Sequence, residues 1–369
     1  MKNLCQFSND LVEEILVRVP VKSLHRSKCV CKGWRDLISR SSFICHITER
    51  LKSHPPLVTG VFCTDLVNVQ DRHPFNATAK ANFLGFGNEM LIESTMDTSL
   101  SFLQRPLVPV ASHKGLLLCS ETPPQCGRDS LKHCVQYLLC NPFTRKWVSL
   151  PKPSFNHHVK NVILFCYEKD QCTEFMVLGI LDSVPLLDKY CSETGKWNLS
   201  NILDKPPKCH VLFNGSVYIC ADSRHLCVYH LREESTRFVK LPIAQQHTSS
   251  QCLGASSELL YYAESDDICL RVWVLIGGVE WALTHRTDYD SLINEYPMIP
   301  GYLYLYHLLC FHPSDCNVLL VELDDGYQQV LYHIDKRQTE VMDKIHINSA
   351  FPVIPYSLPA WPPRIKNTQ

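Results

Sequence analysis

Apolar side chains in the first forty residues recur at the spacing of short α-helices. The first predicted helix has one apolar face, which comprises Leu11, Val12, Ile15, Leu16 and Val19. Its start carries side-chain oxygens, and Glu13 follows Asp10 by three residues, which is the spacing of a capping box. The helix is predicted to end before Pro20, because the proline ring disfavours helical geometry at the residue that precedes it.

Two further short helices are predicted before residue 40. The second carries Leu24, and the third presents an apolar face made of Val30, Trp34, Leu37 and Ile38. These segments predict a small all-α module of three short helices. A unit of about forty residues cannot bury all of these faces against itself, so we expect the module to bind a partner.

Beyond about residue 52 the pattern changes from helical spacing to short, strand-length runs. His54-Pro55-Pro56 interrupts the helical pattern, and the runs that follow are rich in β-branched and aromatic residues. The clearest runs are 57–63, 115–119, 137–140, 162–167, 175–178, 216–221, 226–230, 268–274 and 318–323. They predict an all-β domain of roughly 300 residues, which is too large for one sandwich.

A weak internal repeat indicates how these strands are organised. Each copy has a polar turn with a hydroxyl and a basic residue, followed by an aromatic or β-branched residue that opens the next strand. The opening residues are Trp147, Trp197, Phe238, Val341 and, as a weaker match, Trp281. Their spacing of about forty to sixty residues is that of a four-stranded propeller blade. We therefore predict an irregular β-propeller of about six blades.

Composition excludes several classes of partner. The 369-residue chain has a formal net charge of −1, so its overall field favours neither nucleic acid nor a membrane surface. No apolar run approaches the roughly 20 residues of a membrane span. The first residues lack the apolar stretch of a signal peptide, so we expect a cytoplasmic and/or nuclear protein. The 19 cysteines are odd in number and scattered, which favours reduced structural thiols over disulfides or metal ligands.

The candidate chemical groups point to binding rather than to catalysis. Residues 18–40 hold seven Lys or Arg and one acid, which suits an acidic partner better than nucleic acid because the charges surround short helices. Aromatic residues at strand starts could line a ligand groove, but blade packing is the preferred interpretation for Trp147, Trp197, Phe238 and Trp273. Neighbouring acids such as Asp266-Asp267 point in opposite directions on a strand. We predict no catalytic, cofactor-binding or metal-binding site.

The N-terminal pattern resembles an F-box. The residues at matching positions are Leu11, Ile15, Leu16, Pro20, Leu24, Cys29, Val30, Cys31, Lys32 and Trp34. In the family these positions contact the Skp1-type adaptor or support the residues that do. The resemblance therefore implies an adaptor-binding set that comprises Leu11, Ile15, Leu16, Val19, Pro20, Leu24, Cys29, Val30, Cys31 and Trp34. Three positions depart from the pattern: Phe7-Ser8 replaces Leu-Pro, Val19 replaces Leu, and Ser27 replaces a large apolar residue. These departures predict reduced affinity for the adaptor.

The remainder of the chain resembles the F-box-associated domain of plant F-box proteins. The resemblance spans about residues 57–355 and rests on the segments 112–119, 140–151, 192–197, 213–218 and 271–275, in the order that the family shows. It implies an F-box domain at 3–50 and a propeller at 55–358. It further implies a non-catalytic substrate receptor of a Skp1–cullin–F-box ubiquitin ligase, bound to the adaptor and through it to a cullin.

Two alternatives remain open at this point. The propeller could be a ligand- or glycan-binding module with a helical cap, outside any ligase. A propeller hydrolase would need converging acids in the central channel, and the sequence does not reveal them.

If the chain is a receptor, its target is unknown. We expect target contacts in loops rather than strands, with the polar insertions 121–132 and 286–300 as the candidates.

Overall fold

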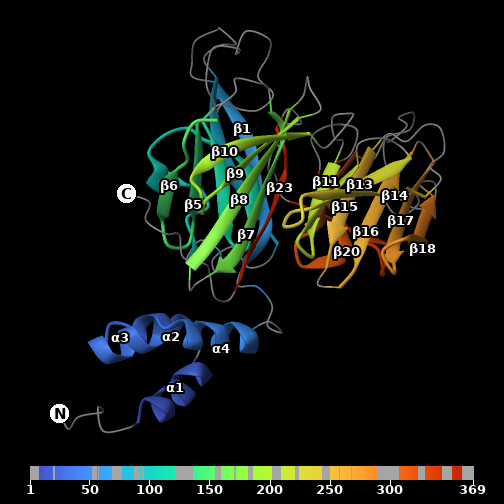
Figure 1. Ribbon diagram of the computed structural model, residues 1–369. Helices are drawn as coiled ribbons and strands as arrows, with labels where there is room; N and C mark the ends of the chain where they lie inside the picture. Colours follow the sequence, from blue (N-terminus) through green and yellow to red (C-terminus); the bar gives the residue numbers. More distant parts are fainter. Residues whose placement is uncertain are drawn as a thin grey trace.

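The computed structural model describes most of the chain, with gaps mainly between strands. The described residues are 8–19, 21–51, 56, 58–68, 77–86, 92, 95–121, 136–153, 159–169, 172–181, 186–201, 209–220, 224–242, 250–256, 258–266, 268–288, 307–322, 329–342 and 351–359. A helical module comes first, and all strands follow it (Figure 1).

The helical module contains four helices with a common core. They are α1 (Asn9–Arg18), α2 (Val21–Ser27), α3 (Lys32–Ile38) and α4 (Ser41–Leu51). The core comprises Val12, Leu16, Val17, Leu24, Leu37, Ile38, Phe43 and Ile47. The prediction of three helices therefore omitted α4, whose signal is the apolar pair Phe43 and Ile47 one turn apart. Val30 precedes α3 in a turn, so its assignment to the third helix is wrong.

The start of α1 also differs from the predicted capping box. Ser8 is the N-cap, and its Oγ accepts a hydrogen bond from the Leu11 amide at 3.4 Å. Glu13 instead faces His46 of α4, with 3.9 Å between its Oε1 and the imidazole Nδ1. Of the three candidate caps Ser8, Asn9 and Asp10, the structure uses Ser8, because Asn9 and Asp10 already belong to the helix.

The strands form a six-bladed propeller, as the sequence predicts. Blade I has the order β23-β1-β2, and blades II to VI each contain four consecutive strands. The bounds are β1 Val58–Asn68, β2 Ala77–Gly85, β3 Val108–His113, β4 Leu116–Ser120, β5 Tyr137–Asn141, β6 Lys146–Ser149, β7 Val159–Lys169, β8 Cys172–Leu181, β9 Leu186–Cys191, β10 Lys196–Asn201, β11 Cys209–Phe213, β12 Ser216–Cys220, β13 His225–His230, β14 Ser235–Lys240, β15 Ser250–Ala255, β16 Leu260–Ser265, β17 Cys269–Ile276, β18 Glu280–Asp288, β19 His307–His312, β20 Asp315–Glu322, β21 Gln329–His333, β22 Gln338–Val341 and β23 Ile354–Leu358, with a short 3₁₀ helix η3 at Ser101–Leu103.

The ring is closed by pairing the two ends of the β domain. β1 pairs antiparallel with both β2 and β23, and Val58 lies opposite Leu358. Tyr356 of β23 is fully buried, stacks edge-on against Phe62 of β1 at 5.2 Å, and donates its hydroxyl to the Gly115 carbonyl of blade II at 3.0 Å. β23 contacts both β3 and β19, so it is the innermost strand of its blade.

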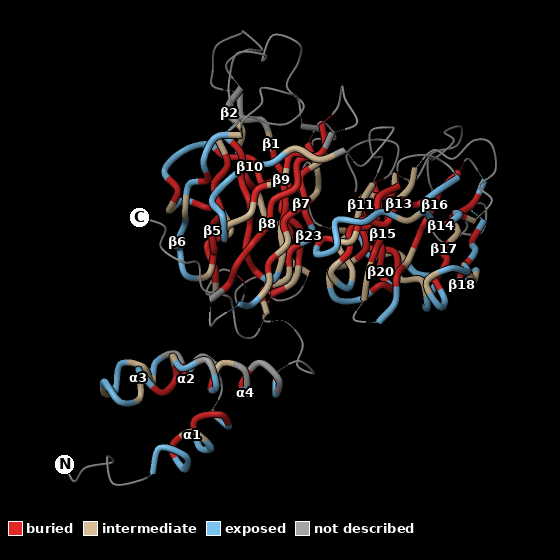
Figure 2. The backbone as a smooth tube through the Cα atoms, in the orientation of Figure 1, coloured by how far each residue is buried: buried red, intermediate tan, exposed pale blue. Residues whose placement is uncertain are grey.

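The buried side chains pack between adjacent blades. Figure 2 shows that the buried residues, in red, occupy the middle of the strands. All five repeat residues stand on the outermost strand of their blades, on β6, β10, β14, β18 and β22. Trp197 donates its indole N–H to the Pro151 carbonyl of the preceding blade at 2.8 Å, and Trp281 donates likewise to Lys240 at 3.0 Å. Trp273 is also buried, whereas Trp147 and Phe238 are exposed.

The propeller has two edges with different connections. β4, β8, β12, β16 and β20 end at the same edge, which we call the upper edge, because the strands of each blade alternate in direction. β1 begins at the opposite, lower edge, where Val58 pairs with the last residue of β23. In Figure 1 the helical module lies below this lower edge. The predicted target loops follow β4 and β18 at the upper edge, but residues 122–132 and 289–300 lie outside the described residues.

Candidate adaptor-binding surface and the polar network of blade V

The apolar residues of α1 divide between the core and the surface. Leu16 is buried in the module's own core, while Leu11 and Ile15 leave 51% and 58% of their surface exposed. Leu11 and Ile15 are four residues apart and therefore lie one above the other on the same side of the helix. Arg18 continues this side and pairs with Glu14 at 2.6 Å. The exposed side of α1 thus combines two large aliphatic side chains with an ion pair.

The turn between α2 and α3 adds a second apolar surface. Val30 is 60% exposed at its tip, next to the exposed Cys29. Cys31 is the N-cap of α3, where its Sγ accepts a hydrogen bond from the Trp34 amide at 3.4 Å. Trp34 itself is half-buried against the helical core. The cap fixes the start of α3 and with it the position at which the indole leaves the helix.

The ten predicted adaptor-binding residues consequently fall into four groups. Leu11, Ile15, Cys29 and Val30 are exposed; Val19, Cys31 and Trp34 are half-buried; Leu16 and Leu24 belong to the core; Pro20 lies outside the described residues. Among the nine described residues, those of the first two groups present atoms that a partner can reach directly. Adaptor contact by any of the ten stays a prediction.

The two serines that depart from the F-box pattern have local roles in this chain. Ser8 caps α1, and Ser27 donates its hydroxyl to the Ser23 carbonyl at 2.9 Å, one turn earlier in α2. A hydroxyl used in this way satisfies the helix but adds no apolar surface.

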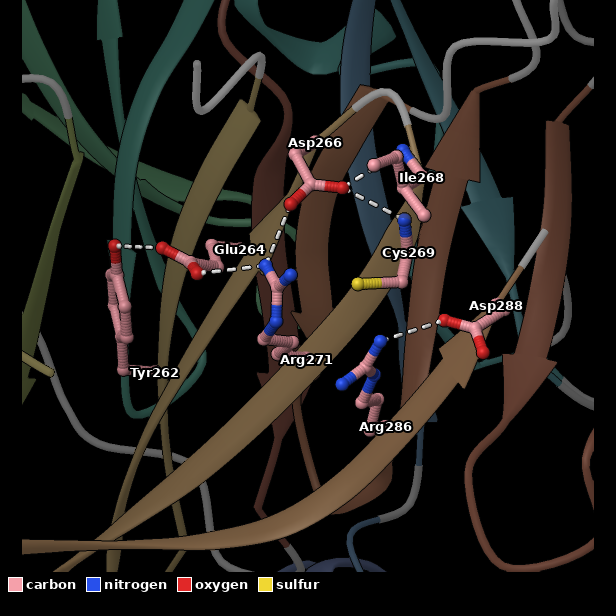
Figure 3. A network of polar contacts seen from close by, with 8 residues as sticks. All are labelled: Tyr262, Glu264, Asp266, Ile268, Cys269, Arg271, Arg286 and Asp288. Atoms are coloured by element: carbon pink, nitrogen blue, oxygen red, sulfur yellow. Dashed lines mark hydrogen bonds and ion pairs between the residues drawn. The ribbon is translucent and has the colours of Figure 1, made fainter. Parts of the chain in front are cut away.

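A separate polar network lies at the upper edge of blade V, where β16 turns into β17 (Figure 3). Arg271 is shared between two carboxylates, with contacts of 2.7 Å to Asp266 and 3.2 Å to Glu264. The other Asp266 oxygen accepts the backbone N–H groups of Ile268 and Cys269, both at 2.8 Å. One aspartate therefore holds both the start of the turn and the amides of Ile268 and Cys269.

The surroundings of the two acids set their pKa values in opposite directions. Burial alone would raise the pKa of Asp266, but the two backbone N–H groups and Arg271 hold it below its usual value. Burial raises the pKa of Glu264, and Arg271 together with the Tyr262 hydroxyl at 3.3 Å offsets part of that rise. Each carboxylate oxygen has a donor, so the network braces the turn and presents no free base. On the adjacent strand β18, Arg286 and Asp288 form an exposed ion pair with 3.3 Å between Nη2 and Oδ1.

The described residues contain no group of three or more His, Cys, Asp or Glu side chains arranged to hold a metal ion. Nor does any helix among them have the length and apolar character needed to cross a membrane.

Comparison with protein families identifies both parts of the chain. Residues 4–46 match the F-box domain, and residues 90–350 match the family described as "F-box protein At3g26010-like, beta-propeller". The chain belongs to this F-box propeller family. These matches confirm the resemblance found in the sequence. The unit formed by helices α1 to α4 is called the F-box module from here on.

Relatives with curated sequences are F-box proteins of Arabidopsis thaliana. F-box protein At5g03970 is 21% identical over an alignment that covers 96% of this chain and 88% of the relative. Putative F-box protein At5g52610 is 24% identical, with 90% and 92% covered. F-box/kelch-repeat protein At3g23880 is 62% identical over 34 residues, which is 9% of each chain. The chain is also similar to a solved structure titled "Crystal structure of Nidogen/Laminin Complex", with a TM-score of 0.46, 8% identity, and 81% and 98% covered.

Proposed function

We propose that this F-box propeller protein is the substrate-recognition subunit of a Skp1–cullin–F-box ubiquitin ligase. In this proposal the F-box module binds the Skp1-type adaptor, and the propeller holds a target protein. The supporting observation is that the module has a complete core of its own yet exposes Leu11, Ile15 and Val30. Large exposed apolar side chains gathered on so small a unit are typical of a docking surface.

The proposed mechanism is proximity rather than chemistry. A receptor that holds the target close to a charged conjugating enzyme raises the effective concentration of the reacting groups. The module and the upper-edge connections belong to opposite edges of the propeller, so adaptor and target have separate surfaces. We place this activity in the cytoplasm and/or the nucleus, where the chain would bind the adaptor and the cullin.

Co-purification tests the proposal. The full chain and a chain of residues 56–369 are each co-expressed with a Skp1-type adaptor and a cullin, and each is isolated through its own tag. We expect only the full chain to retain both proteins. A folded full chain that fails to retain the adaptor, under conditions where another F-box protein succeeds, would overturn the proposal and favour a propeller with a helical cap outside any ligase.

A further inference from the structure

Two reduced cysteines stand opposite each other on the first two strands of blade IV. Cys209 is the first residue of β11, Cys220 is the last residue of β12, and the antiparallel register pairs them directly. The structure describes 14 reduced cysteines, and in the strand registers of the described residues no other cysteine lies opposite a second one. Their position in the sheet therefore distinguishes these two thiols from the scattered cysteines of the other blades.

The hairpin that carries this pair has a fixed register. β11 and β12 are joined by the two-residue turn Asn214-Gly215, in which the φ angles of 47° and 71° both lie in the left-handed region. A two-residue turn of this kind sets the register of the strands that it joins. The pairing then continues from Phe213 and Ser216 to the two cysteines without a bulge. Side chains of directly opposite residues point to the same face of a sheet, so both thiols lie on one side of the hairpin.

That side of the hairpin faces blade V. Cys220 is completely buried in the layer between blades IV and V, and the half-buried Cys209 packs against the same cluster. The Cys220 thiol donates a hydrogen bond to Oε1 of Gln251 in blade V at 3.4 Å. Tyr262 of blade V is a second neighbour: burial and the Glu264 carboxylate raise the pKa of its hydroxyl, and both thiols add to the rise. One sulfur atom of the pair is thus inaccessible, while the other can be reached from solvent.

The separation of opposite strand residues suits a disulfide bond. Directly opposite residues of an antiparallel pair have Cα atoms about 4.5–5.5 Å apart. A disulfide bond joins residues whose Cα atoms are about 4.4–6.8 Å apart. Cys209 and Cys220 can therefore be linked while β11 and β12 keep their register. The link replaces the hydrogen bond from Cys220 to Gln251, which is weak because a thiol is a poor donor.

We propose that Cys209 and Cys220 form a reversible redox site that reacts with small disulfides of the glutathione type. The accessible Cys209 thiolate attacks one sulfur of glutathione disulfide, so that a mixed disulfide forms and one glutathione leaves. The Cys220 thiolate then attacks the Cys209 sulfur, the bond between the two cysteines forms, and the second glutathione leaves. Each cysteine gives up one proton and each departing glutathione takes one up. The protein is oxidised, glutathione disulfide is reduced, and an excess of glutathione reverses both steps.

The site lies at the upper edge of the propeller. β12 ends at this edge, and β11, which contacts the first strand of blade V and is the innermost strand of blade IV, begins there. The turn at Asn214-Gly215 already joins the two strands at the lower edge, so the upper end of the hairpin is its open end. A disulfide would close this end. Oxidation would thereby make the upper edge of blade IV more rigid.

Peptide mass spectrometry tests the proposal directly, because one tryptic peptide carries the pair. Cleavage after Lys208 and after Arg224 releases residues 209–224, which contain Cys209, Cys220 and no other cysteine. The reduced, folded full chain is incubated with glutathione disulfide, quenched with acid, alkylated in denaturant and digested. We expect this peptide to escape alkylation at both cysteines and to be lighter than the reduced peptide by two hydrogens. Treatment with dithiothreitol before alkylation should restore both alkylation sites.

Three variants distinguish the roles of the two thiols. Cys220→Ser should stop the reaction at the mixed disulfide, so the peptide should carry one glutathione on Cys209. Cys209→Ser should leave Cys220 reduced, because this thiol is buried. The matched control, Cys227→Ser, removes another buried thiol of blade IV, which lies opposite Ile219 and Phe238. It should leave the yield of the disulfide unchanged.

Three results would overturn the proposal. A wild-type peptide that is still alkylated at both cysteines would show that the pair does not react with glutathione disulfide. A glutathione adduct on wild-type Cys209, with Cys220 still alkylated, would show that the two sulfur atoms cannot meet in the folded chain. The same share of internal disulfide among the oxidised peptides of the folded chain and of the chain unfolded in urea would show that the register of β11 and β12 does not select the pair.

Discussion

The F-box module and the propeller complete their cores in different ways. The module buries eight apolar residues drawn from one short stretch of chain, and large side chains such as Leu11, Ile15 and Val30 are left over on its surface. The propeller instead closes on itself, since β23 returns to pair with β1 after five other blades. A closed ring completes its hydrophobic core without a partner. Four short helices, in contrast, leave apolar surface that a partner can cover.

The comparison has a complication in blade V, which also exposes aliphatic side chains. They stand at the turns between its strands and on its outer strand: Leu259, Ile268, Ile276, Val279 and Leu283. Exposure alone therefore does not identify the adaptor surface. What distinguishes the F-box module is that its exposed residues occupy the positions that match the family. Stability measurements can distinguish the locally formed core of the F-box module from the core that ring closure completes. Affinity measurements can distinguish the exposed residues of the module from equally exposed residues of blade V.

Ring closure should have the largest effect on stability. A chain ending at residue 350 loses Ile354, Tyr356 and Leu358, all buried against blades I and II. Their burial is worth about 5 kcal/mol or more, which is comparable with the whole stability of a domain. We expect the propeller to lose cooperative unfolding in urea. The F-box module should keep its helices, because its core contains no propeller residue. Cooperative unfolding at the wild-type midpoint would contradict ring closure by β23.

Core truncation in the F-box module should come next. Leu24 is fully buried among the helices, so Leu24→Ala removes packing from a small core, of which eight buried residues are described. We expect a loss of about 2–5 kcal/mol in the free energy of unfolding of the module. Thermal unfolding followed by the helical signal measures it. An unchanged midpoint would place Leu24 on the surface and would contradict the division of the apolar residues described above.

A turn substitution should have the smallest effect and the opposite sign. Arg145 has φ of 57°, in the left-handed region, and its amide closes the β5–β6 turn on the Asn141 carbonyl at 2.8 Å. Gly195, with φ of 66°, holds the corresponding place in blade III. Arg145→Gly should therefore relieve strain and stabilise the propeller by up to about 1 kcal/mol. A midpoint in urea below that of wild type would show that the arginine side chain stabilises the turn.

The sequence predicts the repeated part of the propeller because each blade carries its own local signal. Trp147, Trp197 and Phe238 each follow a polar turn, and each lies on the outermost strand of a blade. Blade I has no such signal, because β1 and β23 come from opposite ends of the domain and meet only in the folded ring. The exposure of Trp147 and Phe238 could not be predicted either, since the neighbouring blade decides whether an aromatic residue is covered.

Local pattern is also insufficient to orient the residues of α1. Leu11 and Ile15 differ from Val12 and Leu16 by one position, which is about 100° around the helix. All four therefore fit one broad apolar face in the sequence, and only packing against α3 and α4 determines which pair turns inward. The buried network around Arg271 was likewise missed. In the sequence Asp266 is considered with its neighbour Asp267, whereas in the structure it shares Arg271 of β17 with Glu264, because β17 folds back beside β16.

The most direct test of the account measures adaptor affinity in variants with matched exposure. Leu11→Ser combined with Ile15→Ser removes the exposed apolar pair of α1 without touching the core. The control, Ile276→Ser combined with Val279→Ser, removes a pair from blade V, of which Ile276 is 55% exposed against 58% for Ile15. Calorimetric titration of the full chain with a Skp1-type adaptor should show affinity at least about tenfold weaker in the first variant and unchanged in the second. Unchanged affinity in the first variant, with the F-box module still folded, would contradict the central claim that this surface binds the adaptor.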